Sequence, residues 1–234
     1  MGARQLRVGG ITAFSATDYP GKLAAVVFVQ GCPWRCGYCH NPHLQDRAGA
    51  TALPWQSVPD LLRRRTGLVD AVVFSGGEPT TDPDLQRAIG EVKAMGFKVG
   101  LHTACIYPRR LVSVLPLLDW VGFDIKAPFA HYQRITGVAG SGEAARECAR
   151  LILASGVDYE CRTTIHPSLL SQDEVRALAA TLAGLGVRNY ALQLFRAQGC
   201  TDSLLNAAAA AGYPDAPTLA AIGALFEHFT LRRG

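Results

Sequence analysis

Three cysteines, Cys32, Cys36 and Cys39, lie within eight residues in the stretch G-C-P-W-R-C-G-Y-C-H-N-P. Thiolates at this spacing bind metal, and three kinds of site are compatible with the residues. The stretch from Cys36 to His40 matches the C-x-x-C-H pattern of haem attachment, while three thiolates with His40 or His43 would form a structural zinc site. Three thiolates alone suit a four-iron cluster in which one iron keeps an open position for a substrate.

Two of these alternatives are weakened by the rest of the sequence. Haem attachment of this kind accompanies export, and the N-terminal stretch M-G-A-R-Q-L-R-V-G-G has no apolar core of a signal peptide. Closed zinc sites more often pair two C-x-x-C hairpins, and the chain has no second one. The spacing therefore favours an open four-iron cluster.

A second candidate site is the stretch S-G-G-E-P at residues 75–79. Gly76 and Gly77 are consistent with a tight turn, and two glycines also let the backbone approach a ligand closely. Glu78, next to them, can accept hydrogen bonds from an ammonium group. The turn follows the cysteines by about one strand and one helix, which makes the combination more specific than either motif alone.

Charged residues at two further strand ends extend the candidate site. Asp124 and Lys126 lie at the end of a predicted strand, and Lys126 is one of only four lysines among 23 basic residues. A compact ammonium is therefore one interpretation, and a surface salt bridge is the other. Arg162 lies within a predicted strand, where a guanidinium needs an anionic partner.

The elements that must position these residues alternate regularly along the chain. Short apolar runs rich in β-branched and aromatic residues predict six strands, and amphipathic segments between them predict six helices. The strands are expected at 24–30, 70–75, 97–103, 120–125, 159–165 and 190–195, and the helices at 55–66, 83–95, 108–117, 143–155, 172–185 and 217–231. Residues 200–216 are expected to form a loop with a short helix.

This alternation predicts an α/β fold with a parallel sheet, either doubly wound or barrel-shaped. Polar residues gather where each strand ends, and the active sites of β/α barrels are built from the carboxyl ends of their strands. We therefore expect a partial (β/α)6 barrel over residues 23–231. It would form a single domain of 234 residues together with an N-terminal segment, residues 1–22.

Composition excludes several other classes of protein. Hydrophobic residues make up 49% of the chain and charged residues 18%, which is not the signature of disorder. The longest apolar run is far shorter than the ~20 residues that cross a bilayer, and the net charge of +4 is spread along the chain. We expect a cytoplasmic protein with neither a membrane nor a nucleic acid as partner. The other four cysteines, at 105, 148, 161 and 200, are expected in the core.

The cysteine pattern C-x3-C-x2-C, with an aromatic residue before its last cysteine, resembles the signature of the radical S-adenosylmethionine (SAM) superfamily. The resemblance implies one 4Fe-4S cluster held by Cys32, Cys36 and Cys39, whose open iron is chelated by SAM. It also implies that the Gly-Gly-Glu turn binds SAM and that the fold is the partial barrel of that superfamily. The cofactor contacts implied by this resemblance are Tyr38, Gly76, Gly77, Glu78, Thr103, Asp124, Lys126 and Arg162.

Four stretches together resemble the activating proteins of anaerobic ribonucleoside-triphosphate reductases: D-Y-P-G-K at 18–22, C-x-Y-C-H-N-P at 36–42, F-D-I-K-A-P at 123–128 and R-T-T at 162–164. The resemblance runs from about Gly10 to Arg196. It implies removal of a hydrogen atom from a glycine of a large glycyl-radical enzyme, with a flavodoxin- or ferredoxin-like protein as electron donor. We expect the partner's glycine loop to enter beside His102 and Cys105.

One departure and two alternatives stay open. Related activases often carry an aspartate at the end of the third strand, where this chain has H-T-A-C at 102–105, so a monovalent cation site beside SAM is in doubt. A compact radical SAM enzyme acting on a small molecule, such as a deazapurine carboxylate synthase, is one alternative. A non-enzymatic iron–sulfur or zinc module is the other.

Overall fold

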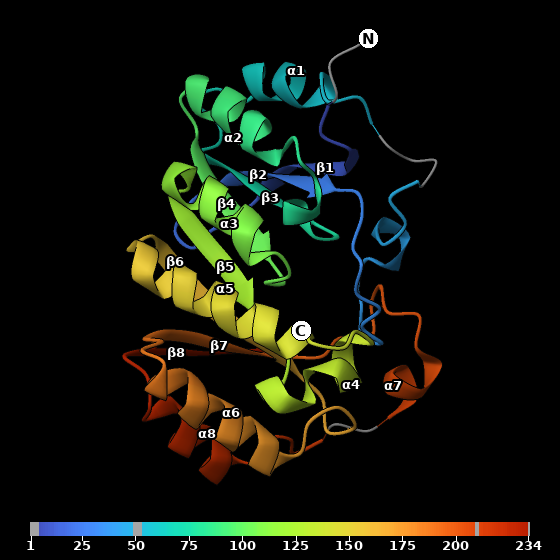
Figure 1. Cartoon of the computed structure of the whole chain (residues 1–234), viewed down its shortest axis with the longest axis vertical. Coiled ribbons are helices and arrows are strands. Elements are labelled where there is room, and N and C mark those ends of the chain that lie inside the picture. Colours follow the sequence, from blue (N-terminus) through green and yellow to red (C-terminus); the bar gives the residue numbers. More distant parts are fainter. Residues whose placement is uncertain (1–4, 49–52, 209–210, 234) are drawn as a thin grey trace.

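The computed structural model of the chain describes residues 5–48, 53–208 and 211–233. Within these residues one sheet of eight strands forms the centre, and the strands lie side by side in the order of the sequence (Figure 1). They are β1 (Val8–Ser15), β2 (Ala24–Val29), β3 (Ala71–Gly76), β4 (Lys98–Thr103), β5 (Trp120–Asp124), β6 (Asp158–Ile165), β7 (Asn189–Leu194) and β8 (His228–Arg232). β1 is antiparallel to β2, and every later neighbouring pair is parallel.

Helices join the parallel strands, and most of them cover one side of the sheet in Figure 1. They are α1 (Ser57–Arg63), α2 (Leu85–Ala94), α3 (Pro108–Val114), α4 (Tyr132–Thr136), α5 (Ser141–Ser155), α6 (Gln172–Gly184), α7 (Ser203–Ala207) and α8 (Ala216–Gly223). The result is an α/β fold with a parallel sheet shaped as a partial barrel, as the alternation of elements predicts. No helix in the described ranges is long and apolar enough to cross a membrane.

The sequence of the strands explains their place in the sheet. β2 and β3 read A-A-V-V-F-V and A-V-V-F-S-G, and their first four residues are buried in both. Continuous apolar strands of this kind are typical of parallel sheets that are covered on both faces. Helix ends carry local signals as well: α6 begins at a capping box, in which Ser171 and Glu174 satisfy each other's backbone N–H groups.

The six expected strands are present as β2 to β7, but two further strands were missed. β1 lies in the expected N-terminal segment, where two adjacent glycines obscure the strand pattern. The expected helix at 217–231 is wrong in its second half, because α8 ends at Gly223 and residues 228–232 pair with β7 as β8. The sequence H-F-T-L-R alternates polar and apolar residues, which is the period of a strand.

The two faces of the sheet carry separate apolar clusters. The larger cluster lies between the sheet and the helices, and its members include Phe74, Val121, Ile89 and Leu178. The opposite face, which we call the inner face, carries a smaller cluster of Tyr19, Ala24, Val26, Ala71, Val73 and Trp120. Successive side chains of a strand point to opposite faces, and the parallel strands all end at the same edge. The loops after β2 to β7 therefore meet at one mouth.

Candidate functional site

The three clustered cysteines lie in the loop after β2, residues 30–45, which we call the cysteine loop. Its two ends are tied together, because the backbone N–H of Gly31 donates to the carbonyl of Leu44 (2.8 Å) and that of Cys32 to the carbonyl of Gln45 (3.0 Å). A turn between Cys36 and Cys39 is closed by a bond from the N–H of Cys39 to the carbonyl of Cys36 (3.1 Å). All three thiols are free and partly exposed.

The loop is anchored against α4. The ring of Trp34 packs edge-on against the ring of Tyr132, with 5.7 Å between their centres. The N–H of Arg35 donates to the carbonyl of Thr136 (3.0 Å) at the end of the same helix. The backbone around Cys32 and Cys36 is thus supported by an element about 100 residues further along the chain.

The donor set of the cysteine loop fits a four-iron cluster with one open iron, because three thiols come from one loop at the mouth. No three His, Cys, Asp or Glu side chains in the described ranges are gathered closely enough to hold a metal ion, so the thiols must turn toward one another on binding. Burial raises the pKa of Cys32 to about 12, and the charge of Glu78 adds to this shift. Cluster binding must therefore release thiol protons, which favours assembly at higher pH.

The Gly-Gly-Glu turn packs directly on the cysteine loop. Gly76 has a φ of +116°, and an added Cβ would lie 2.4 Å from the backbone nitrogen of Val29. A Cβ on Gly77 would lie 2.4 Å from the carbonyl oxygen of Gly31. Only glycine fits these two positions. Packing of the backbone at the end of β3 against the backbone at the end of β2 is enough to explain why, without a ligand.

Glu78 is fully buried and its carboxylate is held from several sides. Oε1 accepts from the N–H and the hydroxyl of Thr80 (3.1 and 2.5 Å), and Oε2 accepts from the N–H of Ala104 (2.7 Å). The hydroxyl of Thr103 lies 2.9 and 3.1 Å from the two oxygens. Burial nevertheless raises the pKa of Glu78. The carboxylate thus ties the turn after β3 to the end of β4, and its contact with an ammonium group stays a prediction.

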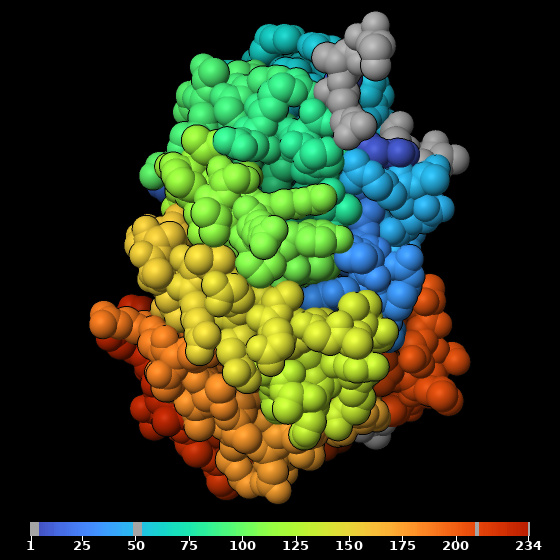
Figure 2. Space-filling view, in the orientation of Figure 1, coloured from blue at the N-terminus to red at the C-terminus, as the bar shows by residue number. Residues whose placement is uncertain are grey.

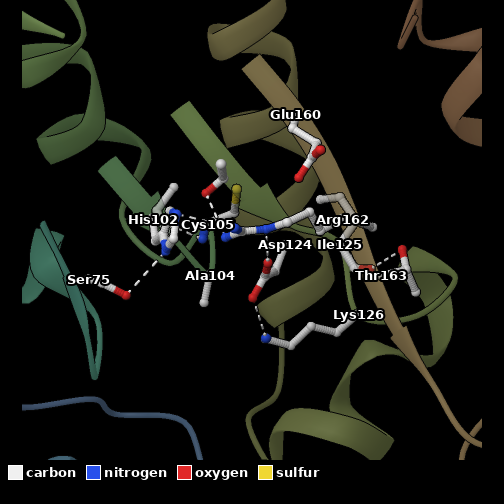
Figure 3. A network of polar contacts seen from close by, with 12 residues as sticks. Ser75, His102, Ala104, Cys105, Asp124, Ile125, Lys126, Glu160, Arg162 and Thr163 are labelled. Carbon is white, nitrogen blue, oxygen red and sulfur yellow. Dashed lines mark hydrogen bonds and ion pairs between the residues drawn. The ribbon is translucent and has the colours of Figure 1, made fainter. Parts of the chain in front are cut away.

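Asp124, Lys126 and Arg162 form a row of charges across the ends of β5 and β6 (Figure 3). The Nε of Arg162 donates to Oδ1 of Asp124 (3.1 Å), and the ammonium of Lys126 lies 3.3 Å from Oδ2. Burial alone would raise the pKa of Asp124, but the two cations hold it below its usual range. The anionic partner that the sequence requires for Arg162 is therefore Asp124.

His102, at the end of β4, borders this row (Figure 3). Its Nε2 lies 2.8 Å from the carbonyl oxygen of Asp18, which can only accept, so Nε2 carries the proton. Nδ1 then accepts from the hydroxyl of Ser75 (3.3 Å). Burial and the charge of Arg162 lower the pKa of His102 to about 3, so the ring is neutral.

Because Nε2 of His102 carries a proton, it cannot accept a hydrogen bond from the guanidinium of Arg162. NH1 of Arg162 lies 3.3 Å from Nε2 of His102, but both atoms are donors. The other amino group of Arg162, NH2, donates to the carbonyl of Gly122 (3.2 Å). A cationic donor of Arg162 therefore lies beside a neutral ring.

Lys126 connects the row of charges to the cysteine loop. It is 8% exposed, and its ammonium lies 5.4 Å from the centre of the Tyr38 ring. Burial raises the pKa of Cys36, and the positive charge of Lys126 opposes that shift. The hydroxyl of Tyr38 is buried and has no hydrogen-bond partner among the described residues. Tyr38, Lys126, Asp124 and Arg162 thus form one continuous group, while Glu78 and Thr103 form a second.

Sequence reasoning missed several residues of the site and misplaced one. Tyr132 fixes the backbone before Lys126, because its hydroxyl accepts from the Lys126 N–H (2.9 Å), and nothing in the sequence signals this role. Asp18 reaches His102 through its backbone, which no side-chain pattern reveals. Cys105 is fully buried in the core on the helix side, so the expectation that a partner loop passes beside it is wrong. The core positions expected for all four single cysteines, at 105, 148, 161 and 200, are confirmed.

The chain is similar to several known proteins. The family model described as "Radical SAM superfamily" matches residues 26–182. A protein of Methanocaldococcus jannaschii named as a glycyl-radical enzyme activating enzyme is 31% identical over 83% of this chain and 82% of its own length. The pyruvate formate-lyase-activating enzyme of Clostridium pasteurianum is 32% identical over 74% of each chain. The crystal structure of methylornithine synthase (PylB) shares the fold, with a TM-score of 0.64 over 88% of this chain and 63% of the longer chain, at 12% identity.

Proposed function

Because the chain belongs to the radical SAM superfamily, whose members use SAM with a 4Fe-4S cluster, we propose that it activates a glycyl-radical enzyme. Two relatives above 30% identity carry that activity in their names. For the partner we propose the anaerobic ribonucleoside-triphosphate reductase, on the four stretches of sequence described above. The observation that carries the proposal is the charged row meeting the cysteine loop at one mouth, through Lys126.

The candidate site residues form two groups with different tasks, and the first group would bind the cluster and SAM. Cys32, Cys36 and Cys39 would hold the cluster, and the cluster with SAM would supply the one-electron chemistry that removes a hydrogen atom from a glycine Cα. Lys126 and the NH1 group of Arg162, which has no acceptor at the neutral His102 ring, would offer donors to the carboxylate of the methionine part of SAM. Asp124 holds both cations in place, so neither is free to swing away.

The second group shapes the site. Gly76 and Gly77 present bare backbone next to the cysteine loop, and Glu78 locks that turn to Thr103 and Ala104. Gly76, Gly77, Glu78, Thr103 and Tyr38 thus remain our candidate SAM contacts. Tyr38 covers the ammonium of Lys126 and excludes water from it, which strengthens its attraction for an anion.

We also place the enzyme in the cytoplasm, as a single radical SAM domain with a flavodoxin- or ferredoxin-like electron donor. Seven free thiols in a chain without disulfides suit a reducing compartment. A cluster that sits in a loop at the rim of the barrel would be within reach of a donor protein.

The test is anaerobic activation. The reconstituted protein, a reductant and SAM are incubated with the anaerobic ribonucleoside-triphosphate reductase or with pyruvate formate-lyase, and glycyl radical is measured by electron paramagnetic resonance. We expect a radical on the reductase, and none on a reductase in which the radical glycine is replaced by alanine. A radical on pyruvate formate-lyase alone would overturn the choice of partner. SAM cleavage with no radical on either protein would overturn the activase proposal and favour a small-molecule substrate.

A further inference from the structure

The segment after β7, residues 195–206, lies along the outer side of the cysteine loop. In Figure 1 it runs from the end of β7 to α7, next to the loop that follows β2. The ring of His40 stacks on the ring of Phe195 with 5.9 Å between centres, and its Nε2 lies 3.0 Å from the carbonyl oxygen of Arg196. Figure 2 shows that the two segments, coloured blue and orange, are in contact at the surface.

The packing between the two segments is tight at one backbone position. Gly199 has a φ of +85°, and an added Cβ would lie 2.6 Å from the carbonyl oxygen of His40. Such a distance is not tolerated between real atoms, so the position requires glycine on both steric and conformational grounds. The segment therefore touches the cysteine loop directly, backbone against backbone.

Cys200 follows at once and is 8% exposed. Its thiol donates to the carbonyl oxygen of Gly37 (3.4 Å), and its sulfur accepts from the N–H of Asp202 (3.4 Å). The carbonyl of Cys200 accepts from the side chain of Asn206 (3.0 Å), and Oδ1 of Asp202 caps the start of α7. Asp202 and Asn206 of the same segment thus hold the sulfur and the carbonyl of Cys200, while its thiol proton bonds the cysteine loop.

We propose that Cys200 is a positioning residue for the cluster: by holding Gly37 it fixes the turn between Cys36 and Cys39. Gly37 is the residue directly after Cys36, it is exposed, and as glycine it has wide conformational freedom. A hydrogen bond to its carbonyl restricts that freedom and sets how the two thiols are presented. This inference rests on the proposed function, because it assigns Cys36 and Cys39 to the cluster.

The first arm of the test uses metal-free, reduced protein, so it does not depend on the cluster. Rates of alkylation of Cys36 and Cys39 by iodoacetamide are followed by mass spectrometry in the native protein and in Cys200→Ala, Cys200→Ser and Cys148→Ala. Cys148→Ala is the matched control, because it removes a buried thiol of α5 that makes no hydrogen bond to the cysteine loop. We expect Cys200→Ala to raise both rates about fivefold, the factor of one lost hydrogen bond. Cys200→Ser, which keeps a donor, and Cys148→Ala should stay near the native rates.

The second arm uses protein reconstituted with iron and sulfide. We expect the Cys200→Ala cluster to lose iron to a chelator about fivefold faster and to show an altered resonance spectrum when reduced, with both restored in Cys200→Ser. Unchanged alkylation and unchanged iron loss in Cys200→Ala would overturn the inference, and so would equal effects in Cys148→Ala. If the native protein binds no iron, the proposed function fails, while the first arm still decides whether Cys200 orders the turn.

Discussion

The inner face of the sheet has two halves of opposite character. Under β2, β3 and the start of β5 it is apolar, and the ring of Tyr19 fills it by stacking on Trp120 with 5.2 Å between centres. Under β6 and β8 it is charged: Arg162 pairs with Asp124, and Arg232 pairs with Glu160 at 2.8 Å. The inner face is thus packed with apolar side chains under β2 and β3, and it carries paired charges under β6 and β8.

The contrast shows which half is there for packing and which for chemistry. Apolar side chains contribute to stability by burial alone, whereas buried charges cost desolvation that their mutual attraction repays only in good geometry. A face that needed only stability would be apolar throughout. The charged half reaches the mouth through Asp124 and Lys126, so we expect it to meet the charged groups of a polar cofactor there.

The largest expected effect comes from the apolar half. Tyr19→Ala removes a ring that is 6% exposed, and we expect the free energy of unfolding to fall by about 3 kcal/mol. Tyr19→Phe keeps the ring and should stay close to the native value. Urea unfolding measures both, and SAM binding by the reconstituted proteins should be unaffected. A Tyr19→Ala protein that is as stable as the native one would remove the packing role of this half.

A change in the charged half should act on both stability and binding. Arg162→Met leaves Asp124 with Lys126 alone and the carbonyl of Gly122 without its donor, so we expect about 2 kcal/mol lower stability. SAM affinity should fall at least about tenfold, because a charged donor at the mouth is lost. Equilibrium dialysis with labelled SAM measures the affinity. Native affinity in this variant would show that the charges serve the fold alone.

Acid should act through His102. Its folded pKa is about 3, whereas an unfolded histidine titrates near 6.5, so the unfolded chain takes up a proton first as the pH falls. The free energy of unfolding should therefore drop between pH 6 and pH 5 by up to about 1.4 kcal/mol from this group. His102→Gln should flatten the profile in that interval. An equally steep profile in the variant would mean that another group carries the acid sensitivity.

The smallest expected effect sharpens the role of Lys126. Lys126→Arg keeps the charge but replaces a compact ammonium by a planar fork in a space bounded by Tyr38 and Asp124. We expect stability close to native and SAM affinity lower by about fivefold, since the fork cannot occupy the same position. The same dialysis measurement decides it. Full affinity would show that any cation suffices at this position.

Much of this arrangement could be predicted from the sequence, because it rests on local signals. Strand ends, glycine pairs and closely spaced thiols leave a pattern within a few residues, and β2 to β7 and the residues of the mouth followed from it. β8 was missed because the five-residue strand follows an apolar helix after only a short connection, residues 224–227. The contacts of His102 with Asp18 and of Cys200 with Gly37 join residues 84 and 163 positions apart, and no local pattern encodes such pairs.

We propose above that a glycine of a partner protein would give up one Cα hydrogen atom to the 5′-deoxyadenosyl group of SAM, which would leave as 5′-deoxyadenosine. The most direct measurement uses anaerobic ribonucleoside-triphosphate reductase prepared with glycine deuterated at Cα, incubated with the reconstituted protein, reductant and SAM. Mass spectrometry of the product should show one deuterium in each 5′-deoxyadenosine formed in step with the glycyl radical. Unlabelled 5′-deoxyadenosine, formed at the same rate with or without the partner, would contradict the claim.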